Sequence, residues 1–178
     1  MTGLLWAAAL LLAAAGVAKL ARPDPTTRAA ADSGIPGSVW FTRRWVVRLL
    51  GMGEVAAALA VVLAGGPRSA AALALLYAAL ALVAARLLRE GPDRDCGCFG
   101  NRSQPVTVAH LVIDLAASAV GLAAVLWPVP GLPELVAADP WPTIALAGGA
   151  IVLAWLAYLA MTALPELSRL REKLAGAA

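Results

Sequence analysis

The chain has 178 residues, of which 61% are hydrophobic and only 14% are charged, and its formal net charge is +3. Soluble domains usually contain about half apolar and about a quarter charged residues, so this composition excludes an ordinary soluble domain and indicates an integral membrane protein. The basic residues flank apolar runs and form no basic tract with interleaved aromatics. This pattern argues against nucleic acid as a partner and points to the lipid bilayer.

Five apolar runs are long enough to cross a bilayer as helices, which requires about twenty residues each. None alternates with the period of two that a half-buried strand requires. The runs are Gly3 to Ala21, Val46 to Ala64, Ser69 to Leu88, Val106 to Trp127 and Thr143 to Ala163. The first has no basic residues before its apolar stretch, which favours a span over a signal peptide. The sequence therefore predicts an all-α, polytopic transmembrane helix bundle over residues 1–164.

The segments between the runs contain turn and capping residues. Asp24 followed by Pro25 predicts the start of a short helix at the membrane interface. Gly65-Gly66-Pro67 predicts a tight connection, and the prolines and glycine of residues 128–133 predict a loop. Pro165 predicts the start of a separate charged helix, so that residues 165–178 form a cytoplasmic tail.

The Lys and Arg residues are distributed unevenly between the two sides of the predicted bundle. Thirteen lie on the side reached after odd-numbered spans, and only Arg68 lies on the other. Because cytoplasmic loops carry the excess of positive charge, this predicts an N-terminus outside and a C-terminus in the cytoplasm. The cysteine-containing loop is then cytoplasmic too. The Ala, Arg and Gly bias suggests a high-GC bacterium and therefore the bacterial plasma membrane.

Four ionisable residues within or at the ends of the spans are candidates for an intramembrane polar cluster: Lys19, Glu54, His110 and Asp114. Charges in spans are costly and are functional candidates by default. His110 and Asp114 are four residues apart and therefore share a helix face. We expect Glu54 and Asp114 to face the bundle interior. The alternative is that Lys19 snorkels to the interface and that Glu54 forms a pair that only joins helices.

The only two cysteines, Cys96 and Cys98, flank Gly97 in the segment DCGCFGN. A structural zinc site needs four ligands, and besides the cysteines the chain offers His110 and a carboxylate such as Asp95, so we expect no metal. Two inert thiols are a further alternative, although free cysteine is usually buried in apolar surroundings and this loop is polar. A Cys-Gly-Cys disulfide closes a small, strained ring that should be easily reduced, and Gly97 supplies backbone freedom. This pattern favours a redox dithiol.

The order of these features resembles the MauE family of methylamine utilisation, within the broader DoxX-like group. The shared features are AGVAKL at the end of the first span, a Glu in the second and DCGCFG before the fourth, and the resemblance covers Leu4 to Trp127. It implies a four- or five-helix membrane protein that works beside a thioredoxin-like partner in maturing the disulfide-rich small subunit of methylamine dehydrogenase. By position, it implies roles for Cys96 and Cys98, with Lys19 and Glu54 as further candidates.

Three functions stay open at this point. The first is a membrane thiol–disulfide relay in which Cys96 and Cys98 exchange with a thioredoxin-fold protein. No cofactor is evident; a quinone is a candidate for the other redox partner, although no sequence pattern specifies a quinone site. The second is a non-enzymatic assembly or scaffold protein. The third is a small-solute or proton transporter built on Glu54, His110 and Asp114. The spans lack Gly/Pro breaks at matching positions, which argues against this function.

Overall fold

The structure is a computed structural model that describes residues 1–32, 37–91, 97, 99 and 105–175. Its elements are helices in the order α1 (Thr2–Ala21), α2 (Asp24–Asp32), the 3-10 helix η1 (Ser38–Thr42), α3 (Arg44–Leu63), α4 (Gly66–Glu90), α5 (Val108–Leu126), α6 (Leu132–Ala138) and α7 (Pro140–Ala175). Within these residues, five helices are long and apolar enough to cross a membrane: α1, α3, α4, α5 and residues 140–163 of α7. The predicted all-α bundle with five spans is confirmed.

Helix α1 is the central element of the bundle, because α3, α5 and α7 all pack against it. The most extensive contacts join α4 to α5 and α1 to α3. Tyr77 connects the α4–α5 pair to the α1–α3 pair, because its hydroxyl in α4 donates a 2.7 Å hydrogen bond to the carbonyl of Ala8 in α1. Large apolar side chains such as Leu75 and Leu82 lie on the outer surface, more than 70% exposed, where lipid would cover them.

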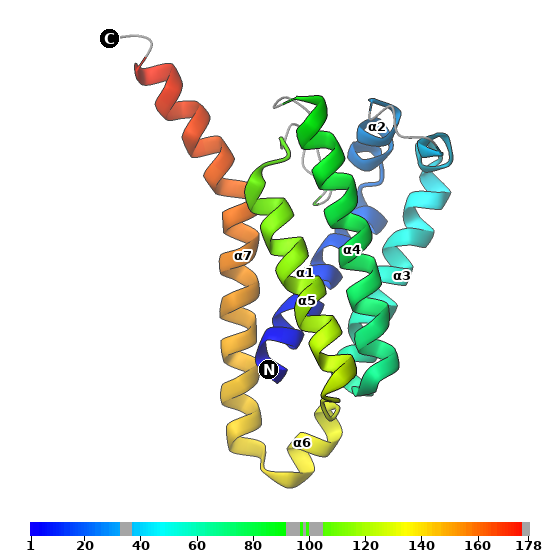
Figure 1. Ribbon diagram of the computed structural model, residues 1–178, viewed down its shortest axis with the longest axis vertical. Coiled ribbons are helices and arrows are strands. Elements are labelled where there is room, and N and C mark those ends of the chain that lie inside the picture. Colours follow the sequence, from blue (N-terminus) through cyan, green and yellow to red (C-terminus); the bar gives the residue numbers. More distant parts are fainter. Residues whose placement is uncertain (33–36, 92–96, 98, 100–104, 176–178) are drawn as a thin grey trace.

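The two ends of the bundle differ in the elements that cover them (Figure 1). One end carries α2, η1 and the ends of the helices joined by the segment between Glu90 and Val108. The opposite end carries the α3–α4 connection and α6. There the amide of Gly66 donates to the carbonyl of Val129, at 2.9 Å. Gly97 lies at the same end as α2, because its carbonyl accepts a hydrogen bond from Thr26.

Two of the predicted connections have a different structure. Residues 128–133 were expected to form a loop, but α6 begins at Leu132, with Gly131 as its N-cap and Pro133 in its first turn. Proline suits this position because the first turn leaves its amide hydrogens unpaired. In the same way, Gly66 and Pro67 belong to the first turn of α4 and not to the preceding connection.

The predicted helix start at Pro165 is wrong. Helix α7 continues without interruption from Pro140 to Ala175 and runs beyond the rest of the bundle (Figure 1). Proline inside a helix removes one backbone hydrogen bond and its ring crowds the carbonyl of the preceding turn, while the Leu, Glu, Arg, Lys and Ala residues that follow Pro165 are strong helix formers. Local propensity on both sides therefore outweighs the proline. The charged C-terminal segment is an extension of the fifth span.

Candidate functional site

Helices α1 and α3 approach each other closely at two glycines, Gly16 and Gly51. A Cβ atom added to either glycine would lie only 2.7 Å from the carbonyl oxygen of the other. The same Cβ positions lie 3.1 Å from the Cβ atoms of Glu54 and Lys19, respectively. Glycine at both positions therefore lets the two backbones touch, which places Lys19 and Glu54 side by side across the helix contact.

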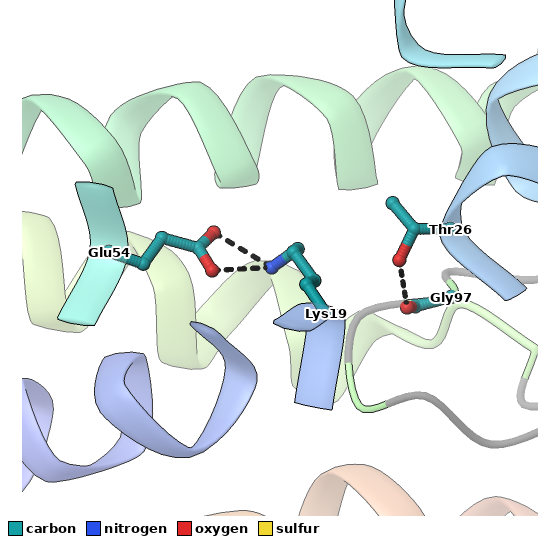
Figure 2. A network of polar contacts seen from close by, with 4 residues as sticks. All are labelled: Lys19, Thr26, Glu54 and Gly97. Carbon is teal, nitrogen blue, oxygen red and sulfur yellow. Dashed lines mark hydrogen bonds and ion pairs between the residues drawn. The ribbon is translucent and has the colours of Figure 1, made fainter. Parts of the chain in front are cut away.

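Lys19 and Glu54 form a buried ion pair across this contact (Figure 2). The Nζ atom of Lys19 lies 2.7 Å from both carboxylate oxygens of Glu54, and the two side chains are only 2% and 1% exposed. Side chains on a helix lean toward its N-terminus. Because α1 and α3 run antiparallel, the side chains of Lys19 and Glu54 lean toward each other. Lys19 does not snorkel to the interface. Glu54 faces the interior, as predicted.

Asp114 also faces the bundle interior and is brought close to the ion pair. Lys19, Tyr77, Asp114 and Phe99 line one small cavity of about 20 Å³, a volume that holds about one water molecule. Asp114 is 5% exposed. Of the predicted polar cluster, the structure therefore gathers Lys19, Glu54 and Asp114.

His110 lies on the same face of α5 as Asp114, but its ring takes part in capping the helix. Thr107 and His110 form a reciprocal capping box, in which the backbone amide of Thr107 lies 3.3 Å from Nδ1 of His110. Because an amide can only donate, Nδ1 accepts, and a neutral ring then carries its proton on Nε2. His110 is 1% exposed, and its Nε2 has no hydrogen-bond partner in the part of the chain that the structure describes.

Gly97, the residue between the two cysteines in the sequence, is fixed against α2. Its φ angle is +64°, and its carbonyl accepts a 2.7 Å hydrogen bond from the hydroxyl of Thr26 (Figure 2). A Cβ atom at this position would lie 2.8 Å from the carbonyl oxygen of Pro25 and 2.9 Å from the Cα of Thr26. Both the positive φ and the close backbone contact require glycine. The glycine therefore anchors its segment to the start of α2.

Phe99 reaches the bundle interior from the same segment. Its ring meets the ring of Tyr158 in α7 edge to face, with centroids 5.2 Å apart, an arrangement that aromatic pairs prefer. The ring also lines the small cavity that contains Lys19 and Asp114. Phe99 and Gly97 thus link the segment to α7 and α2.

Cys96 and Cys98 lie outside the described residues, as do Asp95, Arg94 and Arg102. Their proximity to each other and their redox cycling therefore stay predictions. Among the residues that the structure describes, no group of three or more His, Cys, Asp or Glu side chains could hold a metal ion.

Several residues that build this site were not among the candidates predicted from the sequence: Gly16, Gly51, Thr26, Tyr77 and Phe99. One signal was present for two of them. Gly16 precedes Lys19 by three residues, and Gly51 precedes Glu54 by the same three. Small residues let two helix backbones approach closely, but they are so common in these spans that this spacing alone does not identify the contact. Thr26 and Tyr77 carry no comparable local signal.

Comparison with known proteins identifies the family. The family described as methylamine utilisation protein MauE matches residues 1–129, which include α1 to α5 and the cysteine-containing segment. No curated protein and no solved structure matches the chain. The matched region covers well over half of the 178 residues and contains the Lys19–Glu54 pair and the Gly97 anchor. The chain is therefore a multi-pass membrane protein that belongs to the MauE family.

Proposed function

We propose that this protein is a thiol–disulfide relay of the bacterial plasma membrane, working through Cys96 and Cys98 with a thioredoxin-fold partner. The observation that carries the proposal is the anchor at Gly97, which lies between the two cysteines in the sequence and is held against α2 by Thr26. An inert loop has no need of a glycine fixed at positive φ in backbone contact with a neighbouring helix. A loop that presents two thiols to a partner benefits from a fixed position, because a fixed loop loses less entropy on docking.

The relay is a pair of exchange steps in which electrons and protons balance. A thiolate of the partner attacks one sulfur of the Cys96–Cys98 disulfide, which forms a mixed disulfide and releases the other cysteine as a thiolate. The second thiolate of the partner then attacks the mixed disulfide. The partner leaves as a disulfide, and Cys96 and Cys98 are left reduced. Exchange is reversible, so the same mixed disulfide is reached from either direction.

The polar cluster at the same end of the bundle suits the proton transfers that accompany exchange. Lys19 and Asp114 line a cavity that Phe99 also lines, and Phe99 directly follows Cys98 in the sequence. Ionisable side chains within spans typically form proton relays or substrate pathways. In this proposal the cluster accepts and returns the thiol protons, and it does not contact the partner.

Trapping the mixed disulfide tests the relay. Cys98→Ser removes the resolving thiol if Cys96 exchanges first, and Cys96→Ser tests the opposite order. One of the two variants is expected to accumulate a mixed disulfide with a thioredoxin-fold protein, detected on a non-reducing gel and identified by mass spectrometry. The double Cys→Ser variant, matched in polarity, is the control and should accumulate none. If both cysteines stay alkylatable after mild oxidation and the double variant keeps full function in cells, the relay is wrong and the protein is a non-enzymatic assembly factor.

A further inference from the structure

A second and larger pocket shares Lys19 and Leu80 with the small cavity. Its volume is about 340 Å³, and it lies between α3 and α4, beneath α2 and η1. Lys19, Glu54, Thr26 and Ser38 contribute polar side chains, while residues of α4 such as Ala79 and Leu80 make most of its wall apolar. Ligand pockets typically begin at about 300 Å³ and combine apolar walls with a few convergent polar groups. This pocket has both properties.

The pocket reaches the outer surface of the bundle. Phe41 and Val83 line it, and they are 39% and 40% exposed. In a membrane protein, an opening between two spans admits molecules dissolved in the bilayer. The walls and the opening therefore both select a lipid-soluble ligand.

The ion pair defines the charge and hydrogen-bonding character of that ligand. Lys19 and Glu54 neutralise each other, so a charged ligand would gain little attraction and would lose its hydration. A lysine ammonium has three donor hydrogens, and Lys19 makes two bonds to Glu54, so a third can be donated to a ligand carbonyl. The Glu54 carboxylate has further lone pairs that can accept from a hydroxyl. Donor and acceptor lie together at one end of an apolar pocket.

We infer that this pocket binds a membrane quinone and its quinol. A quinone presents a carbonyl that accepts from Lys19, and the quinol presents a hydroxyl that donates to Glu54, so the same pair of side chains binds both forms. The pocket also lies next to Gly97, which the two cysteines flank in the sequence, because Thr26 both lines the pocket and donates to the carbonyl of Gly97. Binding stands on the pocket alone, whereas a redox role for the ligand rests on the proposed function.

The quinone would supply the oxidant that the relay needs. Oxidation of a dithiol to a disulfide releases two electrons and two protons, and a quinone that takes up both becomes a quinol. Each cycle thus oxidises one partner dithiol and reduces one quinone. Lys19 lines both the small cavity and the larger pocket. The cavity lined by Phe99 and Asp114 is therefore connected to the ligand pocket through the Lys19–Glu54 ion pair.

Photo-crosslinking of the full-length protein in nanodiscs tests the site. The probe is an azido-benzoquinone with a decyl tail, and unlabelled decyl-benzoquinone is the competitor. We expect saturable labelling of peptides from α3 and α4, competed by the quinone and not by decylbenzene, which has the same tail and no carbonyl. Equal competition by decylbenzene, or labelling that does not saturate, would show a non-specific apolar pocket and overturn the inference.

Two variants and one control locate the ligand. Ala79→Trp places a large ring in the pocket and should lower apparent affinity at least about ten-fold. Lys19→Met combined with Glu54→Leu removes both polar contacts and should lower the apparent affinity by a similar factor, because the hydrogen bonds from charged groups to the ligand are lost. Leu82→Trp, on the same helix but 73% exposed and outside the pocket, should bind like the unmodified protein. Unchanged labelling in folded Ala79→Trp protein would exclude this pocket.

The outcomes separate the binding site from the relay. If the quinone binds as expected but the cysteine variants trap no partner, the site stands and the relay fails. If the partner is trapped but labelling is absent, the relay stands with another electron acceptor. Adding decyl-benzoquinone to reduced protein completes the test: the cysteines should become protected from alkylation in the unmodified protein, in a form that dithiothreitol reverses as it does a disulfide and not a covalent quinone adduct, and they should stay alkylatable in Ala79→Trp. Equal protection in both would overturn the role of this pocket in oxidation.

Discussion

Lys19 donates to both carboxylate oxygens of Glu54 at 2.7 Å, one turn from the glycine contact between α1 and α3. Both groups are almost fully buried, so each neutralises a charge that would otherwise be costly to hold in a low-dielectric interior. The pair therefore has a structural role in joining α1 to α3 as well as the binding role inferred above. These two roles predict different effects of single and double variants on stability and on quinone binding.

Removing one partner of the pair should destabilise the protein much more than removing both. Lys19→Met or Glu54→Leu alone leaves an unpaired buried charge and should lower the free energy of unfolding by about 3–5 kcal/mol. The double variant replaces the pair by apolar side chains and should recover most of that loss. Chemical denaturation of the purified protein in detergent measures all three values. Additive losses in the double variant would mean that the pair is not coupled.

The glycine contact between α1 and α3 should tolerate no side chain. Gly51→Ala places a methyl group 2.7 Å from the carbonyl oxygen of Gly16, and the helices must separate, which should cost about 1–3 kcal/mol of stability. Gly53→Ala is the matched control, since it is in the same helix and has nothing within 4 Å of its added Cβ. There the change should stabilise by about 0.5–1 kcal/mol because alanine favours helices. Thermal unfolding compares the two, and equal effects would contradict the contact.

Much of the fold could be predicted from the sequence because the bilayer imposes simple rules on it. The length and apolarity of the spans identify five crossing helices, and the cost of a lipid-facing carboxylate places Glu54 and Asp114 inside. The pairing of Gly16 with Gly51 could not be chosen from the sequence, since small residues are so abundant in these spans that their spacing is not distinctive. The contact of Thr26 with Gly97 joins residues 71 positions apart, and no local pattern encodes it.

The predicted orientation places the N-terminus outside and the end that carries α2 in the cytoplasm. It depends on the thirteen basic residues of one side against Arg68 on the other. A reporter that is active only in the cytoplasm should work when fused to Ala178 and fail when fused to a truncation after Gly66. The reversed pattern would move the cysteine motif to the outer face and place the thioredoxin-fold partner there.

The anchor at Gly97 should control exchange without any change to the cysteines themselves. Gly97→Ala introduces a Cβ atom within 3 Å of the backbone of α2 and should break the contact, which would slow formation of the mixed disulfide with the partner. Gly37→Ala is the matched control, because Gly37 also has a positive φ, +85°, but nothing within 4 Å of its added Cβ. Both variants carry the same kind of backbone strain, and only the first disturbs the anchor.

A pair of substitutions at Thr26 separates the hydrogen bond from the shape of the contact. Thr26→Val keeps the shape but removes the donor to the Gly97 carbonyl, a loss of about 0.5–1.5 kcal/mol, whereas Thr26→Ser keeps the hydroxyl. Trypsin cleavage after Arg94 and Arg102, which flank Gly97 in the sequence, should become faster in Thr26→Val and Gly97→Ala than in Thr26→Ser and Gly37→Ala. The rate of mixed-disulfide formation should fall in the same two variants, because both weaken one contact. If cleavage accelerates while exchange is unchanged, the anchor holds the segment in place but has no part in the relay.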